Sequence, residues 1–366
     1  MKILYVITKA DIKGAQTHLI QLANYFSKKY QVYVAVGNNG PMLQKLNSNI
    51  KIIRLKHLKG PIDIKEDILG AKELAQLIRL IKPKILHLHS SKAGTLGRLA
   101  YICSEKYNTH VIFTAHSWAF TEGVKPLKRF LFKQIEKWLL RVTDKVICVS
   151  DYDRQLALRN NFDGNKLITL HNSVKQSQNQ VLDKVESIKV PPVRFVMVAR
   201  FEYPKLHEMV IKGIQLLKQS TDRLFDLTFI GDGLNLEACK AQVAALGLTP
   251  YIKFLGNVYD VKASLYQYDV FVLISKHEGL PISIIEAMSE GLPIIASDVG
   301  GINELINDNG ILVENNTPKA IAIAMKTYFD QGRIKKDILK SYNRYLDKFT
   351  EDKMLKKLET IYESKH

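Results

Sequence analysis

Residues 270–298, VFVLISKHEGLPISIIEAMSEGLPIIASD, contain two short apolar runs separated by a polar turn and a helical pattern. The runs at 270–275 and 293–298 are typical of buried strands. The Gly-Leu-Pro turn leads into a helix that we expect to begin near Ile282. Strand, helix and strand in this order predict a βαβ unit, and therefore a parallel sheet.

The same alternation extends through the rest of the 366-residue chain. A helix is expected from about Ala15 to Lys28. We predict an α/β protein with two Rossmann-like, doubly wound domains that face each other across a cleft, where ligands bind at the carboxyl ends of the strands. Nine further apolar runs predict strands: 2–8, 31–37, 84–90, 110–116, 145–150, 166–172, 194–200, 227–233 and 252–257.

A polar stretch with no clear period, at residues 174–192, suggests the domain boundary. We interpret it as a linker between a first domain at 1–173 and a second domain at 193–344. A C-terminal helix at about 345–366 is expected to pack back on the first domain. A chain of this length is long for one hydrophobic core and suits two.

The positive charge is concentrated in the first domain. Residues 1–173 contain 28 lysines and arginines against 12 aspartates and glutamates, a net charge of +16, whereas residues 174–344 have a net charge of +1. This asymmetry indicates contact with an anionic surface, either membrane lipid or nucleic acid. We find neither a recognised nucleic-acid motif nor aromatic residues interleaved with cations on a sheet face, so nucleic acid is not the expected partner.

Other bulk features favour a cytoplasmic protein. No apolar run approaches the roughly 18–20 residues that cross a bilayer, and the N-terminal MKILYVIT is typical of a first strand rather than a signal peptide. Cys103, Cys148 and Cys239 lie far apart, which fits neither a disulfide framework nor a metal cluster. The histidines, aspartates and glutamates also lack metal-ligand spacing, and we expect no metal.

One basic segment suits a membrane surface. Residues 124–142, VKPLKRFLFKQIEKWLLRV, combine six cations with apolar residues in a helical pattern. We predict that Lys128, Arg129, Lys133 and Lys137 contact an anionic membrane, near which each cation contributes about 1 kcal/mol. A packed helix with a solvated basic face would show the same pattern, and both interpretations stay open here.

Two glutamates flank the predicted helix start. Glu278 precedes Ile282 and Glu286 lies one turn inside the helix. A helix N-terminus exposes unpaired N–H groups and favours an anion. Arg200 and Lys205 also follow a predicted strand, and two cations beside a helix start suit a diphosphate. The alternatives are an ordinary acidic first turn and an ordinary surface cation.

The segment from Glu278 to Glu286, with SDVGGINE downstream, resembles the E-x7-E signature of glycosyltransferase family 4, whose members have the GT-B fold. In detail the chain is most similar to bacterial capsular and exopolysaccharide glycosyltransferases that act on lipid-linked sugars. The resemblance covers nearly the whole chain and includes KGAQTHLIQLA (13–23), HLHSSKAGTLGRLA (87–100), FTAHSWAF (113–120), ARFEYPK (199–205), FIGDG (229–233) and FLGNV (254–258).

The resemblance implies a retaining enzyme that uses a UDP-sugar and needs no metal or other cofactor. Arg200 and Lys205 would hold the donor diphosphate in place of a metal. Glu278 would contact hydroxyls of the donor sugar, and Glu286 hydroxyls of the ribose. Further donor contacts are implied at Gly14, Gly231, Asn257, Val258, Gly279, Leu280, Pro281 and Ile282.

In the first domain, the resemblance implies that His116 faces the donor sugar as a catalytic residue, although a histidine at a strand end can also be a turn residue. Lys13, His89 and Lys92 would lie on the acceptor side, and His87 would be structural. Lys13 and Ser117 stand where the family commonly has glycine. The sequence therefore leaves open the backbone geometry at Ser117 and whether the charge of Lys13 lies near the phosphates.

The resemblance also implies a pathway. The acceptor would be an undecaprenyl-diphosphate-linked saccharide in capsule or exopolysaccharide synthesis, and the donor UDP-N-acetylfucosamine or a related N-acetylated hexose. The enzyme would bind the cytoplasmic face of the plasma membrane as a peripheral protein. One alternative is a UDP-sugar epimerase of the same fold, which needs acid and base residues and no acceptor groove. A second is a basic nucleic-acid-binding protein, favoured by charge alone.

Overall fold

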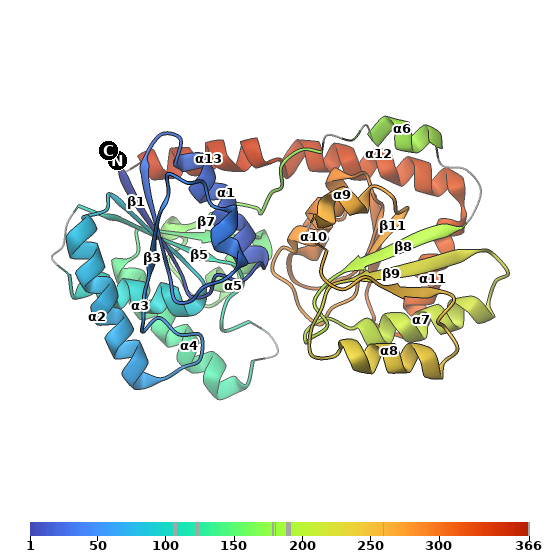
Figure 1. Ribbon diagram of the computed structural model, residues 1–366, viewed down its shortest axis with the longest axis horizontal. Helices are drawn as coiled ribbons and strands as arrows, with labels where there is room; N and C mark the ends of the chain where they lie inside the picture. The colour runs from blue at the N-terminus through green and yellow to red at the C-terminus, as the bar shows by residue number, and fades with distance from the viewer. Residues whose placement is uncertain are drawn as a thin grey trace. The chain divides into compact units, whose positions relative to one another are not determined.

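The computed structural model describes residues 1–104, 108–121, 124–177, 179, 181–187, 192–258 and 260–364. The chain divides into two compact units, Met1–Asn172 with Glu351–His366, and Ser173–Thr350. Each unit contains a parallel sheet covered by helices (Figure 1). Among the described residues, no helix combines the length and apolar character needed to cross a bilayer.

Seven strands of the described chain form the sheet of the first unit, in the order β3-β2-β1-β4-β5-β6-β7. The order reverses between β1 and β4, and doubly wound sheets bind ligands beside such a reversal, at the carboxyl ends of the strands. The strands are β1 Lys2–Ile7, β2 Gln31–Val36, β3 Lys51–Arg54, β4 Ile85–His89, β5 His110–Ala115, β6 Lys145–Cys148 and β7 Leu167–Thr169.

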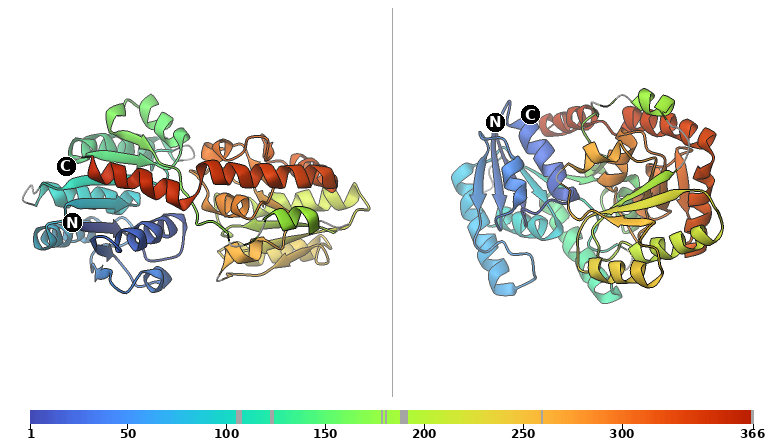
Figure 2. Two further views of the ribbon diagram at one scale, coloured as in Figure 1. Left: turned by 90° about the horizontal axis from the view of Figure 1, so that it is seen from above. Right: turned by 45° about the vertical axis from the view of Figure 1, so that its right-hand side comes forward.

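Successive side chains of β1 pack on opposite faces of this sheet. Ile3 and Tyr5 contribute to the core under α1 and α13, whereas Leu4 and Val6 contribute to the core under α2 and α3. Figures 1 and 2 show α13, from the end of the chain, beside α1. The helices of this unit include α1 Gly14–Phe26, α2 Ile64–Ile81, α3 Ser91–Ile102, α4 Pro126–Leu139, α5 Asp151–Arg159 and α13 Glu351–Glu363.

Six strands of the described chain form the second sheet, in the order β10-β9-β8-β11-β12-β13, which reverses between β8 and β11. Helix α7 packs on α11, and α10 on α12. The strands are β8 Val193–Val198, β9 Phe225–Ile230, β10 Ile252–Phe254, β11 Val270–Leu273, β12 Ile294–Ser297 and β13 Gly310–Val313. The helices include α6 Val181–Ser187, α7 His207–Gln219, α8 Leu236–Ala245, α9 Val261–Leu265, α10 Ile282–Ser289, α11 Pro318–Lys326 and α12 Gln331–Lys348.

The two doubly wound parallel sheets confirm the predicted fold class, and all eleven predicted runs contain strands. Helix α10 begins at Ile282 as predicted. Strands β3 and β13, which lie at sheet edges, were not predicted: the side chains of β3 are largely exposed and most of those of β13 are only half-buried, so neither forms a uniformly buried run. Within the polar stretch 174–192, residues 181–187 form α6, which packs on α12.

Candidate functional site

The loops that follow β8 and β11 meet where the strand order of the second sheet reverses. Lys205 and Ser275 form an isolated antiparallel bridge, and the Lys276 N–H donates to the carbonyl oxygen of Pro204 at 3.0 Å. These backbone contacts bring the loop that carries Arg200 and Lys205 against the loop that carries Glu278. The predicted donor residues of both loops therefore share the edge at which doubly wound sheets bind ligands.

Lys205 and Glu278 form an ion pair, and their side chains are 18% and 12% exposed. A partly buried pair of this kind is screened less by salt than a pair on the surface. Arg200 forms its ion pair with Glu202 instead, and 47% of its side chain is exposed. The structure thus joins Lys205 directly to Glu278 and leaves Arg200 on the more exposed part of the same loop.

Gly300 supports the backbone beside Glu278. It has a φ of +59°, and a Cβ on this residue would lie 1.8 Å from the carbonyl oxygen of Glu278. The next residue, Gly301, donates its N–H to the carbonyl oxygen of Gly279 at 2.9 Å. Only glycine allows this approach, because any side chain would overlap the neighbouring backbone. Gly300 lies in the SDVGGINE segment that carries the resemblance, but no local pattern predicts its contact with Glu278.

The loops after β9 and β10 lie at the same edge of the sheet. Gly231 has a φ of +141°, and a Cβ there would lie 2.2 Å from the carbonyl oxygen of Ala199. Its N–H donates to the carbonyl oxygen of Gly256 at 2.8 Å. Asn257, which is exposed, and Val258, which is half-buried, follow directly. Asn257 and Val258 therefore lie at the same edge of the sheet as the other predicted donor residues of this unit, and their role in donor binding stays a prediction.

Helix α10 begins without a side-chain cap from any described residue, and the Ile284 N–H donates to the carbonyl oxygen of Pro281 at 3.2 Å. Pro281, the residue before the helix, lacks an N–H. Leu280 and Ile282 are buried, whereas Glu286, one turn inside the helix, is partly exposed. The helix start is therefore electrostatically suited to an anion, with one predicted glutamate on each side of it.

A ring of hydrogen bonds fixes the end of β11, where the Glu278 loop begins. The Ser275 N–H donates to Ser297 Oγ at 2.9 Å, Ser297 Oγ to Asn316 Oδ1 at 2.6 Å, and Asn316 Nδ2 to the carbonyl oxygen of Ser275 at 3.0 Å. Ser275 and Ser297 are completely buried. Asn316 is not among the residues predicted from the sequence, because its partners are far away in sequence and no local pattern marks it.

Four histidines gather near the carboxyl edge of the first sheet. His18 lies on α1, His87 and His89 lie in β4, and His116 follows β5. Centroids of the neighbouring rings are 4.3 to 5.9 Å apart, and His89 Nδ1 lies 3.1 Å from His116 Nε2. Three of these side chains are completely buried, whereas His116 is partly exposed.

Burial keeps these imidazoles neutral. It lowers the pKa of His18 to about 4, an effect that the nearby Asn172 side chain partly offsets. Burial also lowers the pKa of His87, His89 and His116 well below the usual range, and charge on neighbouring rings would lower it further. A neutral imidazole carries one N–H proton, which lies on either Nδ1 or Nε2.

His87 has a structural role. Its Nδ1 lies 2.6 Å from the Tyr362 hydroxyl and its Nε2 lies 2.7 Å from Thr114 Oγ1. Tyr362 also forms a 3.0 Å hydrogen bond with the Tyr5 hydroxyl. This buried network ties helix α13 to β1, β4 and β5.

The residues predicted on the acceptor side differ in their surroundings. Lys13 directly precedes Gly14, the first residue of α1, and its Nζ lies 3.7 Å from the Asp11 carboxylate. Lys92 lies 2.6 Å from the Asp67 carboxylate, and only 14% of its side chain is exposed. His89 is completely buried, so it can act on a substrate only through a neighbour. Acceptor binding by these residues stays a prediction.

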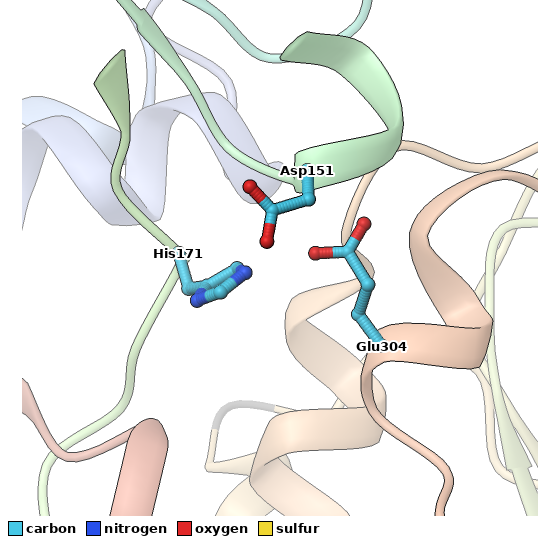
Figure 3. Close-up of side chains that lie close together, drawn as sticks. All are labelled: Asp151, His171 and Glu304. Carbon is cyan, nitrogen blue, oxygen red and sulfur yellow. The ribbon is translucent and has the colours of Figure 1, made fainter. Parts of the chain in front are cut away.

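Asp151 and His171 lie close together at the edge of the first unit (Figure 3). Asp151 begins α5 and accepts a 2.5 Å hydrogen bond from Thr169. Glu304, also drawn, belongs to the second unit. Within the described residues of either unit taken alone, no three potential ligands converge, and two ligands do not make a structural metal site.

Helix α4 packs through one face and exposes another. On the inner face, Glu136 forms a 2.7 Å ion pair with Arg98 of α3, and neither side chain is more than 5% exposed. Four large apolar side chains form a stripe on the outer face, and their spacing places them on one side of the helix. They are Leu127, Phe130, Leu131 and Trp138, which are 81%, 57%, 54% and 47% exposed.

A cavity of about 270 Å³ opens beside this stripe. Arg129 and Lys133, one helical turn apart, both line it, and neither forms an ion pair within the described part of the chain. Phe130 and Asn160 contribute an apolar and an amide wall. Two cations of α4 thus line the same cavity as Phe130, one of the exposed apolar residues of the stripe.

Two family models match the chain. The model of Glycosyltransferase Family 4 matches residues 12–178, and the model of Glycosyl transferases group 1 matches residues 192–331. The chain is similar to the O-antigen biosynthesis glycosyltransferase WbnH of Escherichia coli, with 29% identity over 327 residues and 89% of each chain covered.

A second relative is more specific in name. The chain is 24% identical over 376 residues to the Escherichia coli UDP-Gal:alpha-D-GlcNAc-diphosphoundecaprenol alpha-1,3-galactosyltransferase, covering 99% of this chain and 96% of that one. Among solved structures, Anabaena HepE in complex with UDP-glucose superposes with a TM-score of 0.83, at 17% identity and full coverage of both chains. At this identity the superposition establishes the shared fold.

Proposed function

Because this chain belongs to glycosyltransferase family 4 and is a glycosyltransferase with the GT-B fold, we propose that it transfers a sugar from a UDP-sugar to an undecaprenyl-diphosphate-linked saccharide in bacterial polysaccharide synthesis. The printed names of two relatives support the substrates. One is the Escherichia coli galactosyltransferase described above, and the other is a Campylobacter jejuni N-acetylgalactosaminyltransferase that acts on a diphosphoundecaprenol-linked saccharide.

The ion pair of Lys205 and Glu278 is the observation that supports this proposal most directly. It places a cation and a carboxylate together at the reversal of the second sheet, beside the uncapped start of α10. We assign Lys205 and Arg200 to the diphosphate, Glu278 to hydroxyls of the donor sugar and Glu286 to the ribose. Side-chain cations then neutralise the leaving group, and the site needs no metal for this purpose.

The proposed reaction retains the configuration at the anomeric carbon. The bond between that carbon and the diphosphate oxygen breaks, and a bond to the acceptor hydroxyl oxygen forms on the same face. The acceptor proton moves to the leaving diphosphate, and UDP is released. This assignment requires no carboxylate as a covalent nucleophile. The proposed donor sugar is N-acetylfucosamine or a related N-acetylated hexose.

The decisive experiment separates transfer from epimerisation. The purified protein is incubated with each of a panel of UDP-sugars, with and without an undecaprenyl-diphosphate-linked saccharide, in buffer containing EDTA. We expect UDP release and a longer lipid-linked product only when both substrates are present. Conversion of the UDP-sugar into its epimer without acceptor would identify the alternative enzyme. Loss of activity in EDTA, restored by Mg²⁺, would contradict the metal-free site.

The stripe and cavity of α4 support a second part of the proposal, peripheral binding to the inner face of the plasma membrane. Because the inner face of α4 is anchored by the buried pair of Arg98 and Glu136, its exposed apolar side chains are not its packing face. Insertion of these side chains among lipids would bring cations of α4 toward the lipid phosphates. A lipid-linked acceptor would then reach the enzyme along the membrane surface.

A further inference from the structure

The two ring nitrogens of His89 have different surroundings, and this difference determines which of them carries the proton. His89 is completely buried. Its Nδ1 lies 3.1 Å from His116 Nε2, whereas its Nε2 has no hydrogen-bond partner among the described residues. A buried N–H without an acceptor is rarer and more costly than an unused lone pair. The single proton of neutral His89 therefore belongs on Nδ1, the nitrogen that has a partner.

The state of His116 follows from that of His89. If His89 Nδ1–H donates, His116 Nε2 must accept and cannot carry a proton. The proton of neutral His116 then lies on Nδ1. We propose that His89 is a positioning residue that holds His116 in the Nδ1–H tautomer, so that His116 offers a substrate a hydrogen-bond donor and not a base.

The surrounding groups are consistent with this assignment. Both nitrogens of His87 are already engaged by hydroxyl groups, which can donate or accept in either direction. The His18 ring contacts His116 edge to face, with centroids 5.3 Å apart, and offers no hydrogen bond that competes with His89. Burial disfavours a second proton on any of the four rings, so within this cluster His89 is the ring that orients the proton of His116.

This tautomer matters for the reaction, and here the inference rests on the proposed function. An epimerase needs a base that removes a proton from its substrate. His116 with a protonated Nδ1 and an engaged Nε2 is a poor base, because it could accept a proton only by becoming a buried cation. In the proposed transfer the leaving diphosphate takes the acceptor proton. His116 then only has to donate a hydrogen bond to a sugar oxygen.

The test measures the tautomer directly. ¹⁵N spectra of the histidine-labelled full-length protein distinguish a protonated from an unprotonated ring nitrogen, and the His116 signals are assigned by their loss in His116→Asn. We compare the wild type with His89→Asn, whose amide can donate from about the position of Nδ1, and with His89→Phe, which cannot donate. His110→Phe, at the opposite end of β5, makes the same change at another buried histidine and serves as the control.

We expect only the Nδ1–H form of His116 in the wild type, the His89→Asn variant and the control, and both tautomers in His89→Phe. Turnover should fall about tenfold in His89→Phe, with little change in the KM of the donor, and His89→Asn should restore most of it. An Nε2–H form in the wild type would overturn the proposal, and so would a His89→Asn variant that behaves like His89→Phe. If no sugar is transferred at all, the spectra still decide the tautomer.

Discussion

Lys205 and Glu278 form an ion pair that a bound diphosphate would have to share. Replacing Lys205 or Arg200 with alanine should raise the Kd for UDP about 10- to 100-fold, because a hydrogen bond to a charged group contributes about 1.5–3 kcal/mol. Isothermal titration with UDP measures the change. Lys212→Ala, an exposed lysine on α7, is the control and should bind normally. Wild-type affinity for UDP in both variants would show that Lys205 and Arg200 do not bind the diphosphate.

The two glutamates should divide their work. Glu286→Gln should raise the Kd for UDP, because its proposed partner is the ribose. Glu278→Gln should leave the affinity for UDP nearly unchanged and reduce kcat with the complete donor by about tenfold or more, since its proposed partners are sugar hydroxyls. Binding of UDP and steady-state kinetics together separate the two effects. Equal changes in both variants would contradict the division.

At the scale of single residues, the sequence predicts chemistry better than it predicts partners. The apolar runs and the turn before Ile282 predict a helix start with a glutamate before it and another one turn inside it. In the structure, α10 begins at Ile282. By contrast, the pairing of His87 with Tyr362 joins residues 275 positions apart. Such contacts depend on how the last helix packs on the first sheet, which no local pattern encodes.

Among the elements, the loop at Gly300 tests how strictly the Glu278 backbone is placed. Gly300→Ala forces a side chain against the carbonyl oxygen of Glu278. We expect a loss of about 1–3 kcal/mol in the unfolding free energy. We also expect a larger fall in turnover than in the Gly247→Ala control. Gly247→Ala is a matched control, because Gly247 also has a positive φ, +62°, but its Cβ would meet nothing within 4 Å. Equal effects in the two variants would mean that the contact with Glu278 is unimportant.

Element prediction succeeds where burial is uniform. Nine of the eleven predicted strands lie in the sheet interiors, and the other two, β7 and β10, lie at sheet edges; the alternation of these runs with helical patterns identifies a parallel sheet. Strand β3 is not recognisable as a buried apolar run, because its side chains are mostly exposed. For α4, the pattern of cations and apolar residues predicts a helix but not which face is buried. The buried Arg98–Glu136 pair decides that, and it is a contact between two helices.

At the scale of the whole molecule, the net charge of +16 on residues 1–173 gives the first unit a long-range attraction to anionic lipid. Binding to vesicles that contain anionic lipid should weaken as salt rises, because the Debye length is about 8 Å at physiological salt. Cosedimentation across a salt series measures this. Neutral vesicles are the control and should bind little protein at any salt concentration.

The α4 surface should dominate that binding. Changing Lys128, Arg129, Lys133 and Lys137 to glutamate should release the protein from anionic vesicles, since each cation contributes about 1 kcal/mol near the surface. The exposed lysines Lys28, Lys51, Lys56 and Lys356 lie elsewhere in the first unit. Changing them to glutamate alters the net charge equally, so that variant should still bind, although more weakly. The α4 variant should keep its activity on a water-soluble acceptor analogue, because the proposed donor residues lie mainly in the second unit. If both variants bound vesicles alike, net charge alone would explain the attraction, and α4 would be an ordinary packed helix.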